Sequence, residues 1–511
     1  MSKRYDIAVV GSGFAGSLMA IIARRLGLSV VLLERGKHPR FMIGESSTPL
    51  SNLLLEDLAT RYDLPAIKPL AKWGSWQQHH PEIPCGLKRG FTFYHHVLGQ
   101  ADAPDPGRRN QLLVAASPHD RIADTHWYRA DFDAFLVQQA QEAGVDYVDE
   151  VRLDTLTEDA DGITLGGIKE GATASFRAKF VIDATGPRGF LHRALQLPEA
   201  QFPDYPGTQA LYSHFSGVKR RAETEPELET PPYPADDAAV HHVFDGGWVW
   251  VLRFNNGMTS AGVAATDELA TRLHLCDGAS AWERLLDLLP NLKEQFAEAK
   301  AERRFIHAPR LSFLSGAICG ERWSLLPSAA GFVDPLLSTG FPLTLLGISR
   351  LAEIFGRDWG SSHFQQRLQQ YAEQTNTELH ATARLIGGLY ANMSDFSAFA
   401  ALSLLYFAAA SFSETARRLK KPHLATSFLL HGHPTFGPAC RELLERTEQN
   451  SSKLMEEVRR VIDPIDVAGL CRDDRRNWYP VDAEDLFCSA SKVEATHEEI
   501  TQLLESCEFY P

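Results

Sequence analysis

Two short apolar runs and one amphipathic stretch make up residues 1–34. The apolar, β-branched run over 5–10 predicts a strand, and helical spacing of apolar positions continues to about Leu26. A second apolar run over 28–33 ends on Glu34, and Gly11-Ser-Gly13-Phe-Ala-Gly16 separates the first strand from the helix. The pattern predicts a strand, a glycine turn, a helix and a second strand, the order of a Rossmann-type βαβ unit.

The hydrophobic periodicity changes twice along the rest of the chain. Residues 208–270 alternate apolar and polar positions like an antiparallel sheet, with a proline-rich surface excursion at 225–236. From 345 onward nearly every segment has helical spacing. Elsewhere the pattern predicts strands over 85–96, 145–157, 176–183 and 304–327, and helices over 131–143 and 281–300.

The apolar run at 396–412 is the longest in the chain. It is short and contains serines, so we predict a helix buried on all sides and no integral membrane segment. The alternative is a helix that lines a substrate tunnel or touches a membrane surface.

Composition and charge exclude some classes of function. The formal net charge of -14 repels nucleic acid and anionic lipid, so we expect no nucleic-acid partner. The seven cysteines are scattered, form no C-x-x-C pair and argue against a zinc site or a disulfide framework. The histidine pairs lack helix-spaced ligand geometry, so we predict no metal. The N-terminus lacks a cleavable apolar segment, and we expect a cytoplasmic protein.

The glycine turn has the spacing of a dinucleotide site. Gly11 makes the tight turn, Gly13 lets the backbone approach a pyrophosphate, and Gly16 lets helix and strand pack closely. The amide groups at the start of the helix, including those of Phe14 and Ala15, favour phosphates. Glu34 is positioned to accept hydrogen bonds from ribose hydroxyl groups.

Later motifs follow this unit in a recognisable order. Arg40 and Gly44-Glu-Ser46-Ser47-Thr48 follow the second strand, Arg129-Ala-Asp-Phe-Asp precedes a helix, and Asp183-Ala-Thr-Gly closes a later strand. Gly-Phe-Val-Asp334-Pro opens another helix. The series resembles the flavoprotein monooxygenase superfamily, which implies FAD as cofactor. The resemblance places Asp334 near the ribityl chain and pyrophosphate, and makes Arg40 and Arg129 anion or ribose contacts. The late motif of that superfamily begins Gly-Asp, and here it reads Pro327-Ser-Ala-Ala.

Three further segments narrow the superfamily. Gly-Trp248-Val-Trp250-Val-Leu-Arg resembles the W-x-W-x-I-P motif of flavin-dependent halogenases, with both indoles on one face of a strand. Cys-Gly-Leu-Lys88-Arg resembles the segment that carries their active-site lysine. Asp-Pro-Leu-Leu-Ser-Thr339-Gly340 matches their D-P-L-x-S-T-G pattern, whose last two amides hold halide.

The chain therefore resembles flavin-dependent halogenases of the phenol or resorcinol type. Tryptophan halogenases have a glutamate where this chain has Leu337, which argues against tryptophan as substrate. The resemblance implies reduced FAD from a separate NAD(P)H flavin reductase, chloride or bromide at Thr339 and Gly340, and hypohalous acid captured by Lys88. Trp248 and Trp250 would shield the flavin. The aromatic substrate would arrive free or bound to a carrier protein. By strand alternation we expect His96, not His95, on the face of Lys88.

The order of elements predicts an α/β fold: a Rossmann-type FAD-binding domain, an inserted antiparallel β-sheet on the substrate side, and a helical C-terminal region. We expect the FAD-binding domain over 1–205 and 300–350, including the lysine strand near 85–96. The inserted sheet is expected over 206–299 and the helical region over 351–511.

Other functions fit the same fold. An aromatic hydroxylase would oxidise NAD(P)H itself and would not depend on halide. A reductase of the geranylgeranyl-reductase type would act on an apolar chain. A catalytically silent flavoprotein would act as a binding subunit and would load flavin without turnover.

Overall fold

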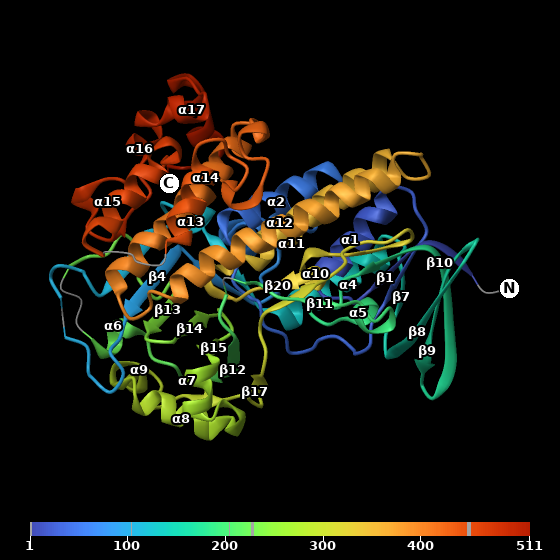
Figure 1. Ribbon diagram of the computed structural model, residues 1–511, viewed down its shortest axis with the longest axis horizontal. Coiled ribbons are helices and arrows are strands. Elements are labelled where there is room, and N and C mark those ends of the chain that lie inside the picture. Colours follow the sequence, from blue (N-terminus) through green and yellow to red (C-terminus); the bar gives the residue numbers. More distant parts are fainter. Residues whose placement is uncertain (1–2, 104, 204, 226–228, 447–450, 511) are drawn as a thin grey trace.

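The computed structural model of the chain describes residues 3–103, 105–203, 205–225, 229–446 and 451–510. Within those residues it has an α/β half on a seven-stranded sheet, a half on a nine-stranded sheet, and a group of C-terminal helices. In Figure 1 the last helices of the chain, drawn in orange-red to red, sit above the nine-stranded sheet, and the N-terminus lies at the far end of the α/β half. The predicted α/β class with a Rossmann-type domain, a second sheet and a helical C-terminal region is confirmed.

The seven-stranded sheet has the order β7-β2-β1-β10-β9-β8, with β19 beside the carboxyl end of β10. Strands β7, β2, β1, β10 and β19 pair in parallel, and β10, β9 and β8 pair antiparallel. Its strands are β1 (Arg4–Val10), β2 (Val30–Leu33), β7 (Asp146–Val148), β8 (Val151–Asp159), β9 (Gly162–Lys169), β10 (Ala172–Asp183) and β19 (Trp323–Leu325).

Helices pack over the parallel part of this sheet because parallel strands are joined by helical crossovers. Residues of α1 (Phe14–Arg25) are buried from Phe14 to Ala23, between the sheet and its neighbouring helices. Those neighbours are α4 (Arg129–Glu142) and α11 (Gly340–Arg357). The start of α1 is thereby held rigidly against the carboxyl end of β1.

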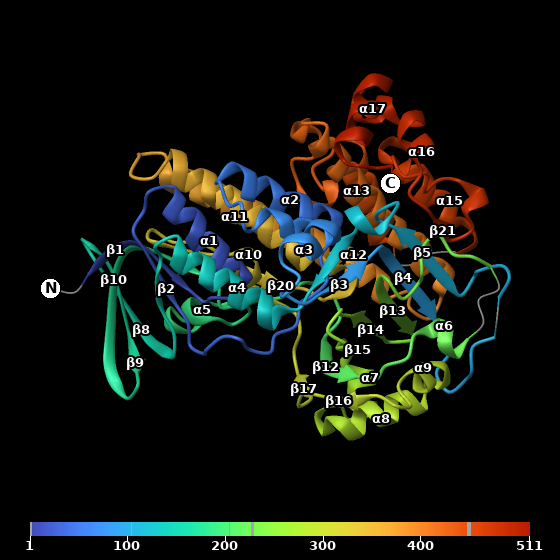
Figure 2. The ribbon, with the colours of Figure 1, turned by 180° about the vertical axis from the view of Figure 1, so that it is seen from behind.

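The nine-stranded sheet has the order β16-β12-β15-β14-β13-β4-β5-β21, with β17 beside β12. Figure 2 shows β4, β13, β14, β15 and β12 side by side, with α7, α8 and α9 below them. Its strands are β4 (Gly90–His95), β5 (Gln111–Ala115), β12 (Thr208–Ser216), β13 (Ala239–Phe244), β14 (Gly247–Arg253), β15 (Thr259–Thr266), β16 (Lys300–Ala301), β17 (Ile306–Ala308) and β21 (Trp478–Tyr479). The helices are α7 (Asp267–Leu273), α8 (Ala279–Asp287) and α9 (Pro290–Gln295).

The segment 85–96 differs from the single strand in the FAD-binding domain that its pattern predicted. The chain changes sheets at Arg89: β3 (Cys85–Lys88) pairs with β6 (Asp124–Trp127), and β4 continues in the nine-stranded sheet. The Arg89 amide donates to the Asp237 carbonyl instead of a ladder partner. This break shifts the alternation, so the expectation that His96 shares the face of Lys88 is wrong.

His96 instead bonds His242 at 2.8 Å and Asp102 at 2.8 Å on the other side of the sheet. The aromatic side chain of β4 that contacts Lys88 is Phe91, whose ring centre lies 3.8 Å from Lys88 Nζ.

The C-terminal region is helical, as predicted, except that β21 returns to pair with β5. Helix α13 is the one described helix long and apolar enough to cross a membrane, and 83% of its apolar window is buried inside the molecule. It is therefore a core helix, as the pattern predicted. The helices here are α12 (Phe364–Tyr390), α13 (Phe396–Arg418), α14 (Phe436–Glu445), α15 (Ser451–Ile462), α16 (Ala483–Cys488) and α17 (His497–Ser506).

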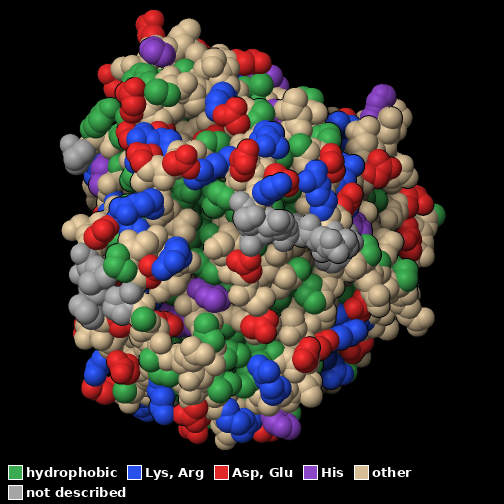
Figure 3. Space-filling model, turned by 60° about the vertical axis from the view of Figure 1, so that its left-hand side comes forward, with side chains coloured by type: hydrophobic (Ala, Val, Ile, Leu, Met, Phe, Trp, Pro, Cys, Tyr) green, Lys and Arg blue, Asp and Glu red, His purple; other side chains and the backbone are tan. Residues whose placement is uncertain are grey.

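Charged side chains cover the surface without sorting by sign on the face drawn in Figure 3, where basic and acidic groups are interspersed. The proline-rich excursion at 225–236 includes residues 226–228, which lie outside the described residues. The remaining elements are α2 (Pro49–Arg61), α3 (Trp73–His79), α5 (Phe190–Ala194), α6 (Arg221–Thr224), α10 (Pro327–Ala330), β11 (Glu199–Ala200), β18 (Phe313–Ser315) and β20 (Gly331–Phe332).

Candidate active site

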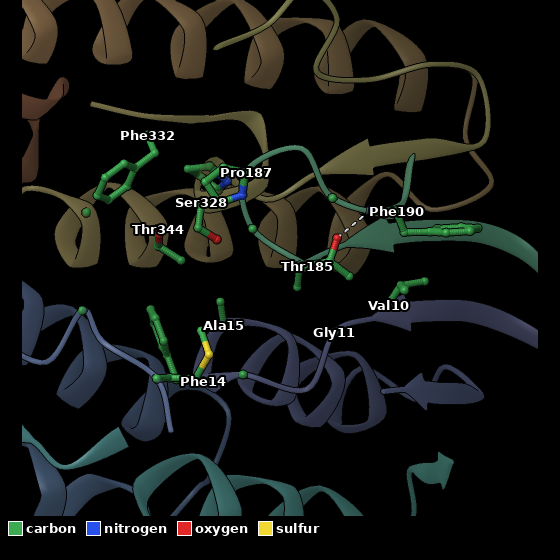
Figure 4. Close-up of a pocket in the computed structure, with 18 of the residues that line it drawn as sticks. Val10, Gly11, Phe14, Ala15, Thr185, Pro187, Phe190, Ser328, Phe332 and Thr344 are labelled. Atoms are coloured by element: carbon green, nitrogen blue, oxygen red, sulfur yellow. Dashed lines mark hydrogen bonds between the residues drawn. The ribbon is translucent and has the colours of Figure 1, made fainter. Parts of the chain in front are cut away.

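A cavity of about 870 Å³ lies at the carboxyl ends of β1 and β10, where α/β folds bind ligands. Its walls are the turn after β1, the start of α1, the loop after β10 and the segment from α10 to the start of α11. In Figure 4, Phe14 and Ala15 lie on one side, and Pro187, Ser328 and Thr344 lie on the other. The volume is within the range of about 300–1,000 Å³ usual for cofactor and ligand sites.

The glycine turn shapes one end of this cavity. Gly11 has φ of 97°, in the left-handed region that favours glycine. A Cβ at Gly16 would lie 1.8 Å from the Gly11 carbonyl oxygen, so α1 approaches the turn only with glycine there. No side chain caps α1 at Gly13, and Gly13, Phe14 and Ala15 line the cavity. The positive end of α1 is therefore available to an anionic ligand.

Glu34 and Arg40 form the next part of the wall. The Glu34 carboxylate accepts hydrogen bonds from the Ser12 amide at 2.9 Å and from the Gly36 amide at 2.8 Å. Burial alone would raise the pKa of Glu34, but the Arg40 charge and these amides bring it below its usual value. Arg40 lies 3.4 Å from Glu34, and its Nε is buried without a hydrogen-bond partner.

Arg129 also lines the cavity, but most of its donors are occupied. Its guanidinium group donates to Asp133 at 2.7 and 2.8 Å and to the carbonyls of Ile43 and Gly44. It thus ties the segment after Arg40 to α4.

Several predicted cofactor residues lie behind the cavity wall. The Asp183 carboxylate accepts from the Thr185 amide and hydroxyl and from the Leu191 amide, which shapes the loop that lines the cavity. Thr48 caps α2, and the Ser47 hydroxyl donates to the Thr125 carbonyl.

Asp334 lines the cavity and is held by two tyrosines that sequence reasoning missed. Its carboxylate accepts from the Tyr205 hydroxyl at 2.7 Å, the Tyr390 hydroxyl at 3.0 Å and the Leu336 amide at 2.9 Å. The pKa of Asp334 is raised to about 6. Burial causes the increase, and these hydrogen bonds limit it. Trp248 Nε1 donates to the Tyr390 hydroxyl at 3.1 Å, so Tyr390 links the W-x-W strand to the cavity.

The predicted halide residues lie at the start of α11. Leu337 and Ser338 both have positive φ, which turns the chain into the helix. Thr339 is the N-cap of α11, no side chain caps the helix, and a Cβ at Gly340 would meet nothing within 4 Å. Both residues line the cavity, so their backbone borders open space.

Lys88 is completely buried on β3. Its Nζ donates to the Ser46 hydroxyl at 2.9 Å and to the Ser47 carbonyl, and lies 3.8 Å from the centre of the Phe91 ring. Burial lowers the pKa of Lys88, and the charge of Asp124 opposes that shift. The segment 46–47, predicted to touch the cofactor, thus contacts the lysine.

The two indoles of β14 lie on one face, as alternation requires. Trp248 and Trp250 belong to the larger apolar core, whereas Val249 and Val251 face the other side of the sheet. Trp250 Nε1 donates to the Ser260 hydroxyl at 3.2 Å. Neither indole lines the cavity of Figure 4.

The fold and this site define a Rossmann-type dinucleotide-binding protein with a buried lysine beside its second sheet. The profile for NAD(P)-binding Rossmann-like domains matches residues 9–59. The tryptophan halogenase profile matches residues 123–399, more than half of the chain. The protein therefore belongs to the tryptophan halogenase family, and the predicted membership in the flavin-dependent halogenases is confirmed.

Individual relatives agree with this family. The chain is 30% identical over 383 residues to monodechloroaminopyrrolnitrin halogenase PrnC of Pseudomonas fluorescens, covering 74% of this chain and 66% of that protein. It is 31% identical over 362 residues to tetracycline 7-halogenase of Kitasatospora aureofaciens, covering 68% and 63%. The match thus spans less than two thirds of either relative.

A solved structure shares the fold over nearly the whole chain. Halogenase PltM in complex with phloroglucinol and FAD superposes with a TM-score of 0.79 at 24% identity, covering 92% of this chain and 99% of that one. Among the described residues, no group of three or more histidine, cysteine or acidic side chains is arranged to hold a metal ion.

Proposed function

We propose that this protein is an FADH2-dependent halogenase that acts on an electron-rich aromatic molecule of the phenol or resorcinol type. The observation that carries the proposal is Lys88, a completely buried lysine whose Nζ bonds the Ser46 hydroxyl and the Ser47 carbonyl, on the segment that follows Gly44 of the cavity wall. The identified relatives PrnC and tetracycline 7-halogenase are named as halogenases of aromatic compounds, and PltM is described with phloroglucinol, a polyphenol, and with FAD.

The cavity fits FAD as the cofactor. Arg40 Nε is buried without a partner, the start of α1 is uncapped, and the turn at Gly13 lets a pyrophosphate approach the backbone. Reduced FAD, when bound, supplies the two electrons with which O2 and halide yield hypohalous acid. The cofactor-binding residues that we propose are Gly11, Gly13, Phe14, Ala15, Gly16, Glu34, Arg40, Ser46, Ser47, Thr48, Arg129, Asp183 and Asp334.

Thr339 and Gly340 are the proposed halide site. Their backbone lines the cavity at the uncapped, positive end of the 18-residue helix α11. Both chloride and bromide suit backbone amides.

Lys88 is the proposed capture residue. Its depressed pKa makes both protonation states accessible: the ammonium can hold hypohalous acid by hydrogen bonding, and the neutral amine can react with it to a haloamine. The dry surroundings of Nζ keep the oxidant from water. Trp248 and Trp250 are buried in the apolar core, and we propose that they keep substrate from the flavin.

Leu337 has no exposed surface and offers no carboxylate at the position that holds a glutamate in tryptophan halogenases. A phenol supplies an activating hydroxyl group of its own, which favours the phenol or resorcinol class. Reduced flavin would come from a separate NAD(P)H flavin reductase, and the substrate would arrive free or on a carrier protein.

The test combines the holoenzyme with a flavin reductase, NADH, O2 and chloride or bromide, and measures halogenated products of phenols, resorcinols, pyrroles and indoles by mass spectrometry. Lys88→Met keeps the buried volume but removes the amine. We expect it to lower product formation about 10²–10⁴-fold, while the release of diffusible hypohalous acid continues. Lys179→Met, on an exposed lysine of β10, is the matched control and should behave like wild type.

Oxygenated products without halogen would assign the protein to the hydroxylases. Equal turnover by wild type and Lys88→Met would remove Lys88 from the mechanism.

A further inference from the structure

A second cavity, of about 190 Å³, lies beside Lys88 and away from the dinucleotide cavity. Phe91 of β4 and Tyr406 and Phe407 of α13 form its apolar inner wall. The cavity adjoins the lysine because the Phe91 ring that it exposes lies 3.8 Å from Lys88 Nζ. A molecule bound here would lie against Asp124 and the Phe91 ring, both of which neighbour Lys88, while the lysine itself stays behind the cavity wall.

One carboxylate in this wall is buried and incompletely bonded. Asp124 stands directly opposite Lys88 in the β3–β6 ladder, so the two side chains leave the same face. Asp124 Oδ1 accepts from Asn52 Nδ2 at 2.8 Å, whereas Oδ2 is buried without a hydrogen-bond partner. A buried carboxylate oxygen without a donor is costly, which indicates that a ligand supplies one.

We propose that Asp124 accepts the hydroxyl proton of a single-ring phenol bound in this cavity beside Lys88. The inference rests on the proposed halogenase function and extends it to the proton acceptor and to the substrate size. A cavity of about 150 Å³ is large enough for benzene, so 190 Å³ suits one substituted ring rather than a fused ring system.

The electrostatic environment of Asp124 and Lys88 favours proton exchange between them and a ligand. Burial raises the pKa of Asp124, and the Lys88 charge opposes that increase. Burial also lowers the pKa of Lys88. The other charges that act on Asp124 are Glu414, which raises its pKa, and Arg418, which lowers it; both are on α13. A carboxylate with a raised pKa takes a phenolic proton more readily than an ordinary one, and the Lys88 ammonium stabilises the phenolate.

The chemistry balances with hypohalous acid as the oxidant. The phenolic proton moves to Asp124, and a π-electron pair of the ring forms the carbon–halogen bond as the oxygen–halogen bond breaks. The departing hydroxide takes a proton from the Lys88 ammonium and becomes water. The ring carbon then loses its proton to the Lys88 amine, and Asp124 returns its proton to the phenol oxygen. The sum is arene and hypohalous acid giving haloarene and water.

The outer wall of the cavity comes from the C-terminal segment, including Val467, Tyr479, Leu486 and Phe509. These residues lie beyond the part matched by the family profile, which ends at 399. The C-terminal segment, which lies outside the family profile, would thus limit the size of the aromatic ring that the cavity accepts.

The first measurement needs no turnover. A nitrophenol is added to the FAD-loaded protein at a pH below the nitrophenol's own pKa but above the raised pKa of Asp124, and the visible phenolate band is recorded. We expect the band on binding to wild type and its loss in Asp124→Asn, which keeps the shape and the contact with Asn52. Asp120→Asn, on the exposed carboxylate that pairs with Arg89, is the matched control and should retain the band.

The second measurement compares kcat/KM for a phenol that is neutral at the assay pH and for one that is already ionised. Asp124→Asn should lower the value about 10²–10⁴-fold for the neutral phenol and less than about tenfold for the ionised one. Asp124→Glu should restore part of the loss.

Equal losses on both phenols, or a phenolate band that persists in Asp124→Asn, would overturn the role of Asp124. Failure of the proposed function looks different: wild type would then produce no halogenated phenol and no hypohalous acid, whatever the binding spectra show. If Asp124→Asn does not fold, Asp124→Glu decides. This variant keeps a carboxylate but changes the packing, so a proton-acceptor role predicts that it retains the phenolate band, and loss of the band in folded Asp124→Glu would overturn the proposal.

Discussion

Gly16→Ala tests whether the contact between α1 and the glycine turn builds the cofactor site. The new Cβ would lie 1.8 Å from the Gly11 carbonyl oxygen and 3.0 Å from the Ala184 side chain. Because the carbonyl belongs to the backbone of the turn, α1 has to move outward by roughly 1.5 Å before van der Waals contact is restored. Its N-terminal amides move with it, away from the place that we assign to the pyrophosphate.

Two effects of opposite sign set the magnitude. Alanine in a helix interior gains about 1 kcal/mol over glycine in helix propensity. Overpacking costs about 1–3 kcal/mol, so the net stability loss is modest. Losing one charge-assisted hydrogen bond to a phosphate costs about 1.5–3 kcal/mol of binding, which weakens FAD affinity roughly 10- to 100-fold.

The assay is a fluorescence titration of FAD binding, with thermal unfolding measured on the same samples. Gly356→Ala is the control, because it is also a helical glycine and its Cβ would meet only the flexible Leu26 side chain at 3.2 Å. It should bind FAD like wild type. Wild-type FAD affinity in Gly16→Ala would refute the packing argument.

Two further predictions concern stability. Burial raises the pKa of Asp334 to about 6, above the ordinary value of about 3.9, so the folded protein retains a proton that the unfolded chain releases. The stability of the cofactor-free protein should therefore fall as pH rises through this window, and Asp334→Asn should flatten that slope in thermal unfolding; an unchanged slope would contradict this. Phe399→Ala, at a position of α13 with no exposed surface, should cost about 3–5 kcal/mol in chemical unfolding, whereas Ser397→Ala on the exposed side should not. Equal effects would argue against α13 as a core helix.

Local spacing was sufficient to predict the first βαβ unit and its glycine turn. The strand and helix periods are encoded within about ten residues, and Gly16 packs on the backbone of Gly11, five residues before it. The buried helix α13 was predictable for the same reason, because its apolar positions cover every side. Family resemblance also depends on short motifs, and it singled out Lys88 and the Thr339-Gly340 pair from sequence alone.

Only the tertiary structure decided which distant residues meet. The change of sheet at Arg89 depends on long-range pairing of β3 with β6 and of β4 with β13, and it reversed the side on which His96 lies. The links from Asp334 through Tyr390 to Trp248, and the pairing of Asp124 with Lys88, join segments far apart in the chain. Periodicity reports which face of an element is apolar, but strand register and the packing of helices on sheets determine what that face contacts.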